Sequence, residues 1–160
     1  MAKKKKNIVS LVWVLALLLG VLAIVFYEVL NATRIKGIIG DDLLIKGWEY
    51  TFGHKEPLRE VKVGWFAILP FIFLVLGTLG TFVGATKYKK FLFIAAGLLL
   101  VGSVLLFFTK TFVLAEFKSE NGDLAYKLVK DGYKLRGGPI VGGIFGILAA
   151  GAAGCGAVAK

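Results

Sequence analysis

Four long apolar stretches constrain the fold of this 160-residue chain more than any other feature, and they cover residues 8–30, 64–85, 91–108 and 139–159. An α-helix rises 1.5 Å per residue, so roughly 20 apolar residues can cross a hydrocarbon core roughly 30 Å thick. The chain is 58% hydrophobic, a composition typical of integral membrane proteins. We therefore predict an all-α integral membrane protein: one domain over residues 1–160, forming a four-helix transmembrane bundle.

The fourth stretch is unusually rich in small residues. They recur there every four positions, at Gly142, Gly146, Ala150 and Gly154. The second stretch has two similar rows, one made by Gly77 and Thr81 and the other by Gly80 and Gly84. Such rows let helix backbones approach closely in lipid, where burying apolar side chains gains little. We expect helix-packing seams, within the chain's own bundle or against a second copy; the alternative is that Gly and Ala are simply common in membrane helices.

Charge placement predicts an orientation. Lys3 to Lys6 precede a first stretch that is too long for a cleaved signal peptide, which favours a signal anchor with a cytoplasmic amino end. Four spans then place both termini in the cytoplasm and the loops 31–63 and 109–138 outside. The inner segments carry eight lysines and no acidic residue, whereas the outer loops carry twelve Lys/Arg and nine acidic residues. The total count of basic residues opposes this orientation, but the first helix and the short inner segments favour it. Lysine-dense inner ends and cysteine-free loops suit the plasma membrane of a bacterium, its inner membrane.

The two outer loops carry different strand signals. In the first, residues 44–52 alternate in character and place Trp48, Tyr50 and Phe52 on one face, a pattern typical of a half-buried strand. In the second, the dipeptides 121–122 and 131–132 are Asn-Gly and Asp-Gly, which favour tight hairpins. We predict a small extracytoplasmic β-layer formed by both loops. The alternative for the second loop is a short helix over residues 123–130 that ends before Gly132.

Residues that carry chemistry are scarce. Ionisable side chains are absent from the middle of all four spans, which argues against proton- or ion-coupled transport. One histidine, His54, and one cysteine, Cys155, cannot build a zinc, haem or disulfide site, so we expect no cofactor. The positive net charge follows from the span-flanking lysines, and we expect no nucleic-acid partner. An enzyme using Asp41 and Asp42 is a minor alternative.

The layout resembles small tetraspan membrane proteins of the claudin-like type. The resemblance covers four spans, a larger first outer loop, a smaller second loop and a short inner turn, with Gly47-Trp48 matching part of the family's Gly-Leu-Trp loop signature. The two cysteines of that signature are missing. The resemblance implies an extracellular sheet lying on a four-helix bundle, with an adhesion, barrier or accessory role.

Together these features predict a protein without enzymatic activity. We expect a structural or accessory protein that assembles with itself or with other membrane proteins in the lipid bilayer. Trp48, Tyr50 and Phe52 are the candidate partner contacts, or they pack the outer layer onto the bundle. The alternative is a subunit of an oligomeric pore or transporter, with Thr78, Thr81 and Ser103 along a water-filled axis. At the outer membrane face, Glu28 could pair with Lys110, or each could reach water independently.

Overall fold

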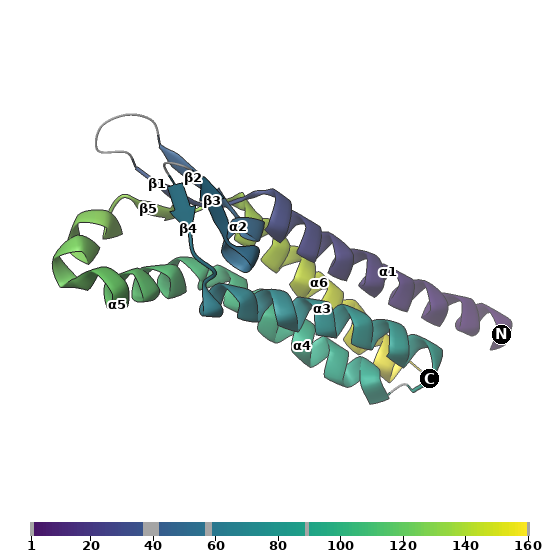
Figure 1. Ribbon diagram of the computed structural model, residues 1–160. Helices are drawn as coiled ribbons and strands as arrows, with labels where there is room; N and C mark the ends of the chain where they lie inside the picture. Colours follow the sequence, from purple (N-terminus) through teal and green to yellow (C-terminus); the bar gives the residue numbers. More distant parts are fainter. Residues whose placement is uncertain (1, 37–41, 57–58, 89, 160) are drawn as a thin grey trace.

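Four long helices form the body of the protein, seen in a computed structural model that describes residues 2–36, 42–56, 59–88 and 90–159. They are α1 (Ala2–Val29), α3 (Trp65–Thr86), α4 (Lys90–Phe107) and α6 (Gly137–Val158), and they lie side by side with both chain ends at one end of the bundle (Figure 1). Each contains a segment long and apolar enough to cross a membrane: Leu11–Val29, Ile68–Thr86, Lys90–Phe107 and Gly137–Val158. The four predicted apolar helices are confirmed.

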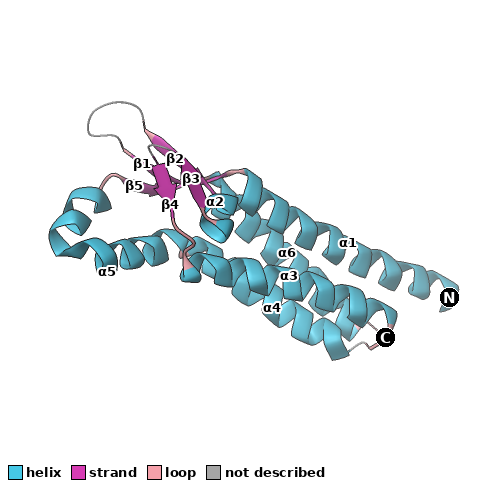
Figure 2. Cartoon of the chain, in the orientation of Figure 1, coloured by secondary structure: helices cyan, strands magenta, loops and turns pink. Residues whose placement is uncertain are grey.

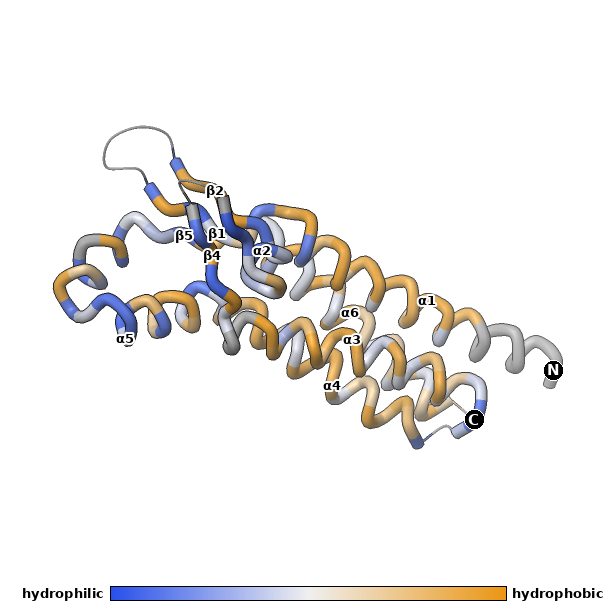
Figure 3. Tube along the Cα trace, in the orientation of Figure 1, coloured by the Kyte–Doolittle hydropathy of each residue, from blue (hydrophilic) through white to orange (hydrophobic). Residues whose placement is uncertain are grey.

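The bundle has a closely packed side and a looser one. Helix α6 packs extensively against both α1 and α4, and α4 also packs against α3, whereas α1 and α3 meet over a smaller area. The shared core combines alanines with a few leucines, including Ala23, Leu74, Leu99, Leu106 and Ala149. Apolar residues cover the bundle along its length, and hydrophilic residues concentrate beyond one end (Figure 3).

The segments between the apolar helices form a cap at the end of the bundle opposite the chain termini (Figure 2). We call the described parts of residues 31–63 and 109–136 the cap. Its sheet contains β1 (Asn31–Ile35), β2 (Leu43–Lys46) and β5 (Tyr133–Leu135), antiparallel in the order β2-β1-β5. Because β5 comes from the second loop and β1 and β2 from the first, the predicted sheet that joins both loops is present. A separate hairpin pairs β3 (His54–Glu56) with β4 (Arg59–Val61).

The strand predicted over residues 44–52 is wrong in its second half. Strand β2 ends at Lys46, and Gly47–Phe52 is a short helix, α2. The Glu49 carboxylate accepts a hydrogen bond of 2.7 Å from the Lys46 backbone N–H, which stabilises the start of α2. On a helix, Trp48 and Phe52 share one face and Tyr50 lies on another. The alternating aromatic residues therefore belong to a helix that docks on the bundle.

The hairpins predicted in the second loop are also wrong, and the alternative helix is right. Residues Thr109–Lys130 form α5, which bends sharply at Gly122, where φ is 80° and ψ is 174°. This positive φ favours glycine, and the kink lets the segment after it return toward the sheet (Figure 1). The turn at residues 131–132 leads from α5 into β5, which pairs with β1 of the first loop. No hairpin forms across this turn, because the residues before it are helical.

Candidate functional site

Helix α2 docks the cap onto the end of α1. A Cβ atom on Gly47 would collide with the Tyr27 backbone carbonyl, so only glycine allows this approach. The Thr51 hydroxyl donates a hydrogen bond of 3.0 Å to Glu28 Oε1. Glu28 Oε2 is buried and has no hydrogen-bond partner among the described residues. Of the two possibilities for Glu28, the pair with Lys110 is not formed among the described side chains, and Glu28 is instead held by Thr51.

Three buried hydroxyls join the two loops inside the cap. Thr33 on β1 and Tyr50 on α2 are hydrogen-bonded at 2.6 Å, Tyr133 on β5 is 3.1 Å from Thr33, and the two tyrosine hydroxyls are also in contact. Thr33, Tyr50 and Tyr133 are at most 5% exposed. Burial raises the pKa of Tyr50 well above the ordinary tyrosine value and also raises the pKa of Tyr133, so both phenols are neutral donors at physiological pH. We call these three residues the hydroxyl cluster.

A cavity of about 310 Å³ lies between the sheet and α5. Its wall is mostly apolar, and the apolar residues come from β1, β2, β4 and α5: Ile35, Leu43, Ile45, Val61, Val113, Phe117 and Val129. Tyr50 and Tyr133 of the hydroxyl cluster also line it. Charged and polar side chains form its rim, namely Glu60, Lys62, Glu116, Glu120 and Asn121. The cavity thus combines an apolar interior with a charged mouth.

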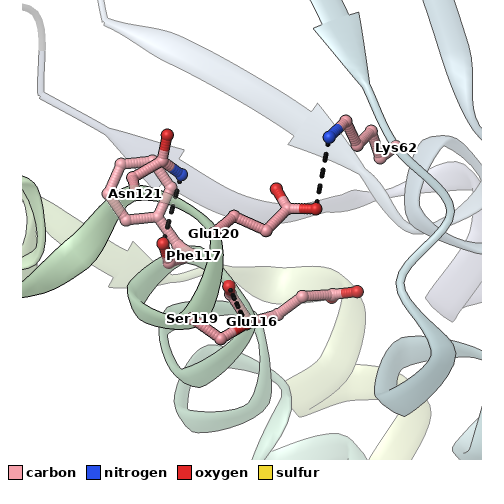
Figure 4. A network of polar contacts seen from close by, with 6 residues as sticks. All are labelled: Lys62, Glu116, Phe117, Ser119, Glu120 and Asn121. Carbon is pink, nitrogen blue, oxygen red and sulfur yellow. Dashed lines mark hydrogen bonds and ion pairs between the residues drawn. The ribbon is translucent and has the colours of Figure 1, made fainter.

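The rim carries more negative than positive charge. Lys62 Nζ lies 3.2 Å from Glu120 Oε1, and Glu116 and Glu120 extend from α5 in the same direction (Figure 4). Asn121 Nδ2 donates to the Phe117 carbonyl at 3.1 Å, just before the kink (Figure 4). Partial burial, and then the neighbouring Glu120, raise the pKa of Glu116, while Lys62 opposes the shift. Glu116 is therefore a partly buried carboxylate of the rim whose surroundings favour its protonated form.

The small residues predicted for the fourth span face different neighbours. A Cβ on Gly142 would lie 2.9 Å from the Ala23 carbonyl oxygen of α1, and one on Gly146 would collide with the Ser103 hydroxyl of α4. Ala150 is 7% exposed in the bundle core. Gly154 has open space on its Cβ side. The first three positions thus lie at close contacts within one bundle, and the fourth does not.

The second-span rows lie against α4. A Cβ on Gly77 would lie 2.9 Å from the Leu99 backbone nitrogen, and one on Gly84 would lie 2.8 Å from the Leu92 backbone nitrogen. At Gly80 the nearest atom would be the Ala95 Cβ, at 3.2 Å. Thr81 is fully buried and donates a hydrogen bond to the Gly77 carbonyl at 3.0 Å. Close backbone approach between α3 and α4 depends on this face.

The three aromatic residues predicted to share one face of a strand lie in different environments. Tyr50 is inside the hydroxyl cluster and is 5% exposed, so it offers no surface to a partner. Trp48 packs edge-on against the ring of His54, which begins β3. Phe52 is 65% exposed and its ring meets that of Phe71 on α3, with 5.8 Å between centroids. Trp48 and Phe52 therefore remain as surface candidates.

The span hydroxyls face the interior of a single chain. Thr78, Thr81 and Ser103 are all buried, and each donates to a carbonyl of its own helix, at 2.8, 3.0 and 2.5 Å. Within the single chain their hydroxyls are therefore satisfied by backbone carbonyls.

Asp42 and Cys155 are the remaining candidate residues that the structure describes. Asp42 forms an ion pair with Arg34, and Asp41 lies outside the described residues. Cys155 is an exposed thiol on α6. Within residues 2–36, 42–56, 59–88 and 90–159, no three His, Cys, Asp or Glu side chains gather as a metal site would require.

None of the sites predicted from the sequence includes the cavity or its rim. Glu116 and Glu120 are four residues apart and so share a helix face, but that signal appears only if residues 109–121 are taken as helix. Thr33, 17 residues from Tyr50 and 100 from Tyr133, had no local pattern that marked it.

Comparisons with known proteins give no relative on which to base an assignment. Neither the protein-family models nor the curated proteins nor the solved structures yield a match to this chain. The claudin-like resemblance thus stays a prediction from the layout of the sequence.

Proposed function

We propose that this chain is a non-enzymatic structural or accessory protein of the plasma membrane, one that assembles with another membrane protein or with itself. In this proposal the four apolar helices cross the bilayer, both termini are cytoplasmic, and the cap is on the outer side. The membrane type is that of a bacterial inner membrane, as the lysine-dense inner ends suggest.

One observation carries the proposal: the two loops fold together into a cap that is fixed on the bundle. The hydroxyl cluster joins strands and helix from both loops, and Gly47 and Thr51 hold α2 against the end of α1. Crossing a bilayer requires no such structure. A folded cap with defined side-chain positions supports a role in recognition, because recognition needs a surface of fixed shape.

The surface we assign to partner contact surrounds Phe52. This ring is 65% exposed, Val63 beside Gly53 is 42% exposed, and both lie where the cap meets α3. Large exposed aromatics are enriched at the centres of protein interfaces. An aromatic at this level would also suit a membrane–water interface, in which case its replacement would leave any complex intact.

The test is native mass spectrometry of the protein extracted gently from its own membrane, for wild type, Phe52→Ser and the control Leu124→Ser. Leu124 is 81% exposed on the far segment of α5, so its replacement controls for loss of an apolar surface residue. We expect a defined complex for wild type and Leu124→Ser, with at least a fivefold lower yield of complex for Phe52→Ser. A wild-type protein that is monomeric even after cross-linking in the membrane would overturn the proposal. A pure homo-oligomer that conducts ions would favour the pore alternative in its place.

A further inference from the structure

The cavity between the sheet and α5 has the size of a small-molecule site. Its volume is about 310 Å³, at the lower limit of the range for ligand pockets. At about 30 Å³ for each water-sized group, it has room for about ten non-hydrogen atoms. A lipid with two acyl chains is far larger than this, so the cavity suits a small free ligand.

The wall of the cavity selects for an apolar ligand body. Ile45 and Val61 are buried members of the cap core, and Ile35 and Val113 pack against them. The two tyrosines at the cavity satisfy each other and Thr33, so their hydroxyls do not require a ligand group. A polar or charged group placed deep in this cavity would lose its hydration without a partner.

The rim selects for positive charge. It holds three carboxylates, from Glu60, Glu116 and Glu120, and one ammonium, from Lys62. Lys62 is paired with Glu120, and Glu60 is 3.9 Å from Lys55 outside the cavity. Glu116 forms no hydrogen bond or ion pair with any side chain in the described part of the chain, although it is half-buried. The nearby ammonium of Lys62 is already paired with Glu120, so a cationic group beside Glu116 would provide the close partner that Glu116 lacks among the described side chains.

We propose that this cavity binds a small amphipathic amine, with the apolar body against the Ile45–Val61–Val113 wall and the ammonium group beside Glu116. The proposal goes beyond the assembly role and is independent of it. Small anions are disfavoured by the excess of carboxylates, and a neutral ligand would leave Glu116 partly desolvated and unpaired.

The probe we choose is 2-phenylethylamine, which combines one ammonium with an aromatic body of suitable size. Titration of the purified full chain in detergent, followed by isothermal calorimetry, should give saturable binding with a Kd of about 0.1–1 mM, as expected for so few atoms. Empty micelles are titrated in parallel to subtract partition of the amine. The neutral analogue 2-phenylethanol and the anion 3-phenylpropionate should bind at least tenfold more weakly.

Two variants test the residues. Glu116→Gln keeps the shape of the side chain and should weaken binding of the amine about tenfold or more, while Val113→Phe should fill the cavity and abolish binding. Asp123→Asn is the matched control, because Asp123 lies on the same helix but pairs with Lys118 away from the cavity; its Kd should stay within twofold of wild type. Circular dichroism tests whether each variant is folded. If Val113→Phe does not fold, Glu116→Gln is the decisive variant.

The proposal is overturned if wild type and Glu116→Gln bind the amine equally, or if 2-phenylethanol binds as tightly as the amine. It is also overturned if the heat of wild-type titration equals that of empty micelles. None of these results bears on the assembly proposal, which is measured as complex mass and depends on Phe52.

Discussion

The bundle and the cap are stabilised in different ways. In the bundle, glycines and alanines bring helix backbones together, and the buried hydroxyls of Thr78, Thr81 and Ser103 bond to carbonyls of their own helices. In the cap, buried hydroxyls from both loops bond to each other, carboxylates are partly buried, and a cavity of about 310 Å³ remains open. The described cavity lies among short strands and a kinked helix, away from the closely packed helix backbones. Packing of backbones thus dominates in the bundle, whereas buried polar contacts and the described cavity lie in the cap.

The largest expected loss of stability comes from a substitution that disrupts helix packing in the bundle. Gly146→Leu forces a side chain into the space of the Ser103 hydroxyl and of Leu74, 3.1 Å from the new Cβ, so it should cost about 3 kcal/mol or more. Gly151→Leu is the control, because Gly151 is exposed and its Cβ side is open. Thermal unfolding in detergent measures both variants. Equal midpoints for Gly146→Leu and wild type would show that α6 does not pack as described.

A second substitution separates the cap from the bundle. Gly47→Ala should displace α2 from the end of α1, because the added Cβ would meet the Tyr27 carbonyl, and a cost of about 2–3 kcal/mol is expected. Hydrogen exchange should increase in α2 and β2 while α4 and α6 keep their protection. Gly137→Ala, at a glycine with open space, provides the comparison. Unchanged exchange in α2 would argue against this docking contact.

A smaller effect tests the hydroxyl cluster. Tyr50→Phe removes the hydroxyl that contacts both Thr33 and Tyr133 but leaves those two bonded, so it should cost about 1 kcal/mol at neutral pH. Burial raises the pKa of Tyr50, so the neutral phenol stabilises the fold fully below the ordinary tyrosine pKa near 10, and this stability is lost as the pH rises above that value.

Thermal midpoints between about pH 9 and 11 therefore distinguish wild type from the variant. The wild-type midpoint should fall more steeply than that of Tyr50→Phe, and the exposed-site control Tyr88→Phe should follow wild type. Parallel curves for all three proteins would contradict a buried position for the Tyr50 hydroxyl.

The smallest effect concerns the cavity rim without ligand. The pKa of Glu116 is raised in the fold, so the protonated acid is favoured there, and this contribution is complete below the unfolded value of 4.5 and lost as the pH rises through the folded value. Glu116→Gln should match wild type near pH 4 and be about 1–2 °C more stable near pH 7. Differential scanning fluorimetry at both pH values measures the difference. A variant less stable than wild type at pH 7 would mean that the Glu116 carboxylate already has a favourable partner.

The apolar helices could be predicted from the sequence because their cause is local. About twenty apolar residues in a row satisfy their backbone groups as a helix, whatever lies beside them, so the predicted and observed bounds agree to within a few residues. A sheet shared by the two loops was also predicted, from strand alternation in the first loop and turn dipeptides in the second.

The helix at residues 47–52 could not be predicted from the local sequence pattern. The alternation of Trp48, Tyr50 and Phe52 is compatible with a strand, and nothing in the sequence reveals that the Tyr27 carbonyl lies beside Gly47. The helix forms because docking on α1 and the Glu49 bond to Lys46 outweigh local strand preference.

By itself, the sequence determined that this protein has four apolar helices with small-residue faces, because hydropathy and spacing are properties of short segments. Only the tertiary structure decided which neighbour each small face meets, that Thr33 bonds to tyrosines 17 and 100 residues away, and that Glu116 lies at the mouth of a cavity. These features depend on distances between segments far apart in the chain, and such distances are fixed only when the two loops fold onto each other and onto the bundle.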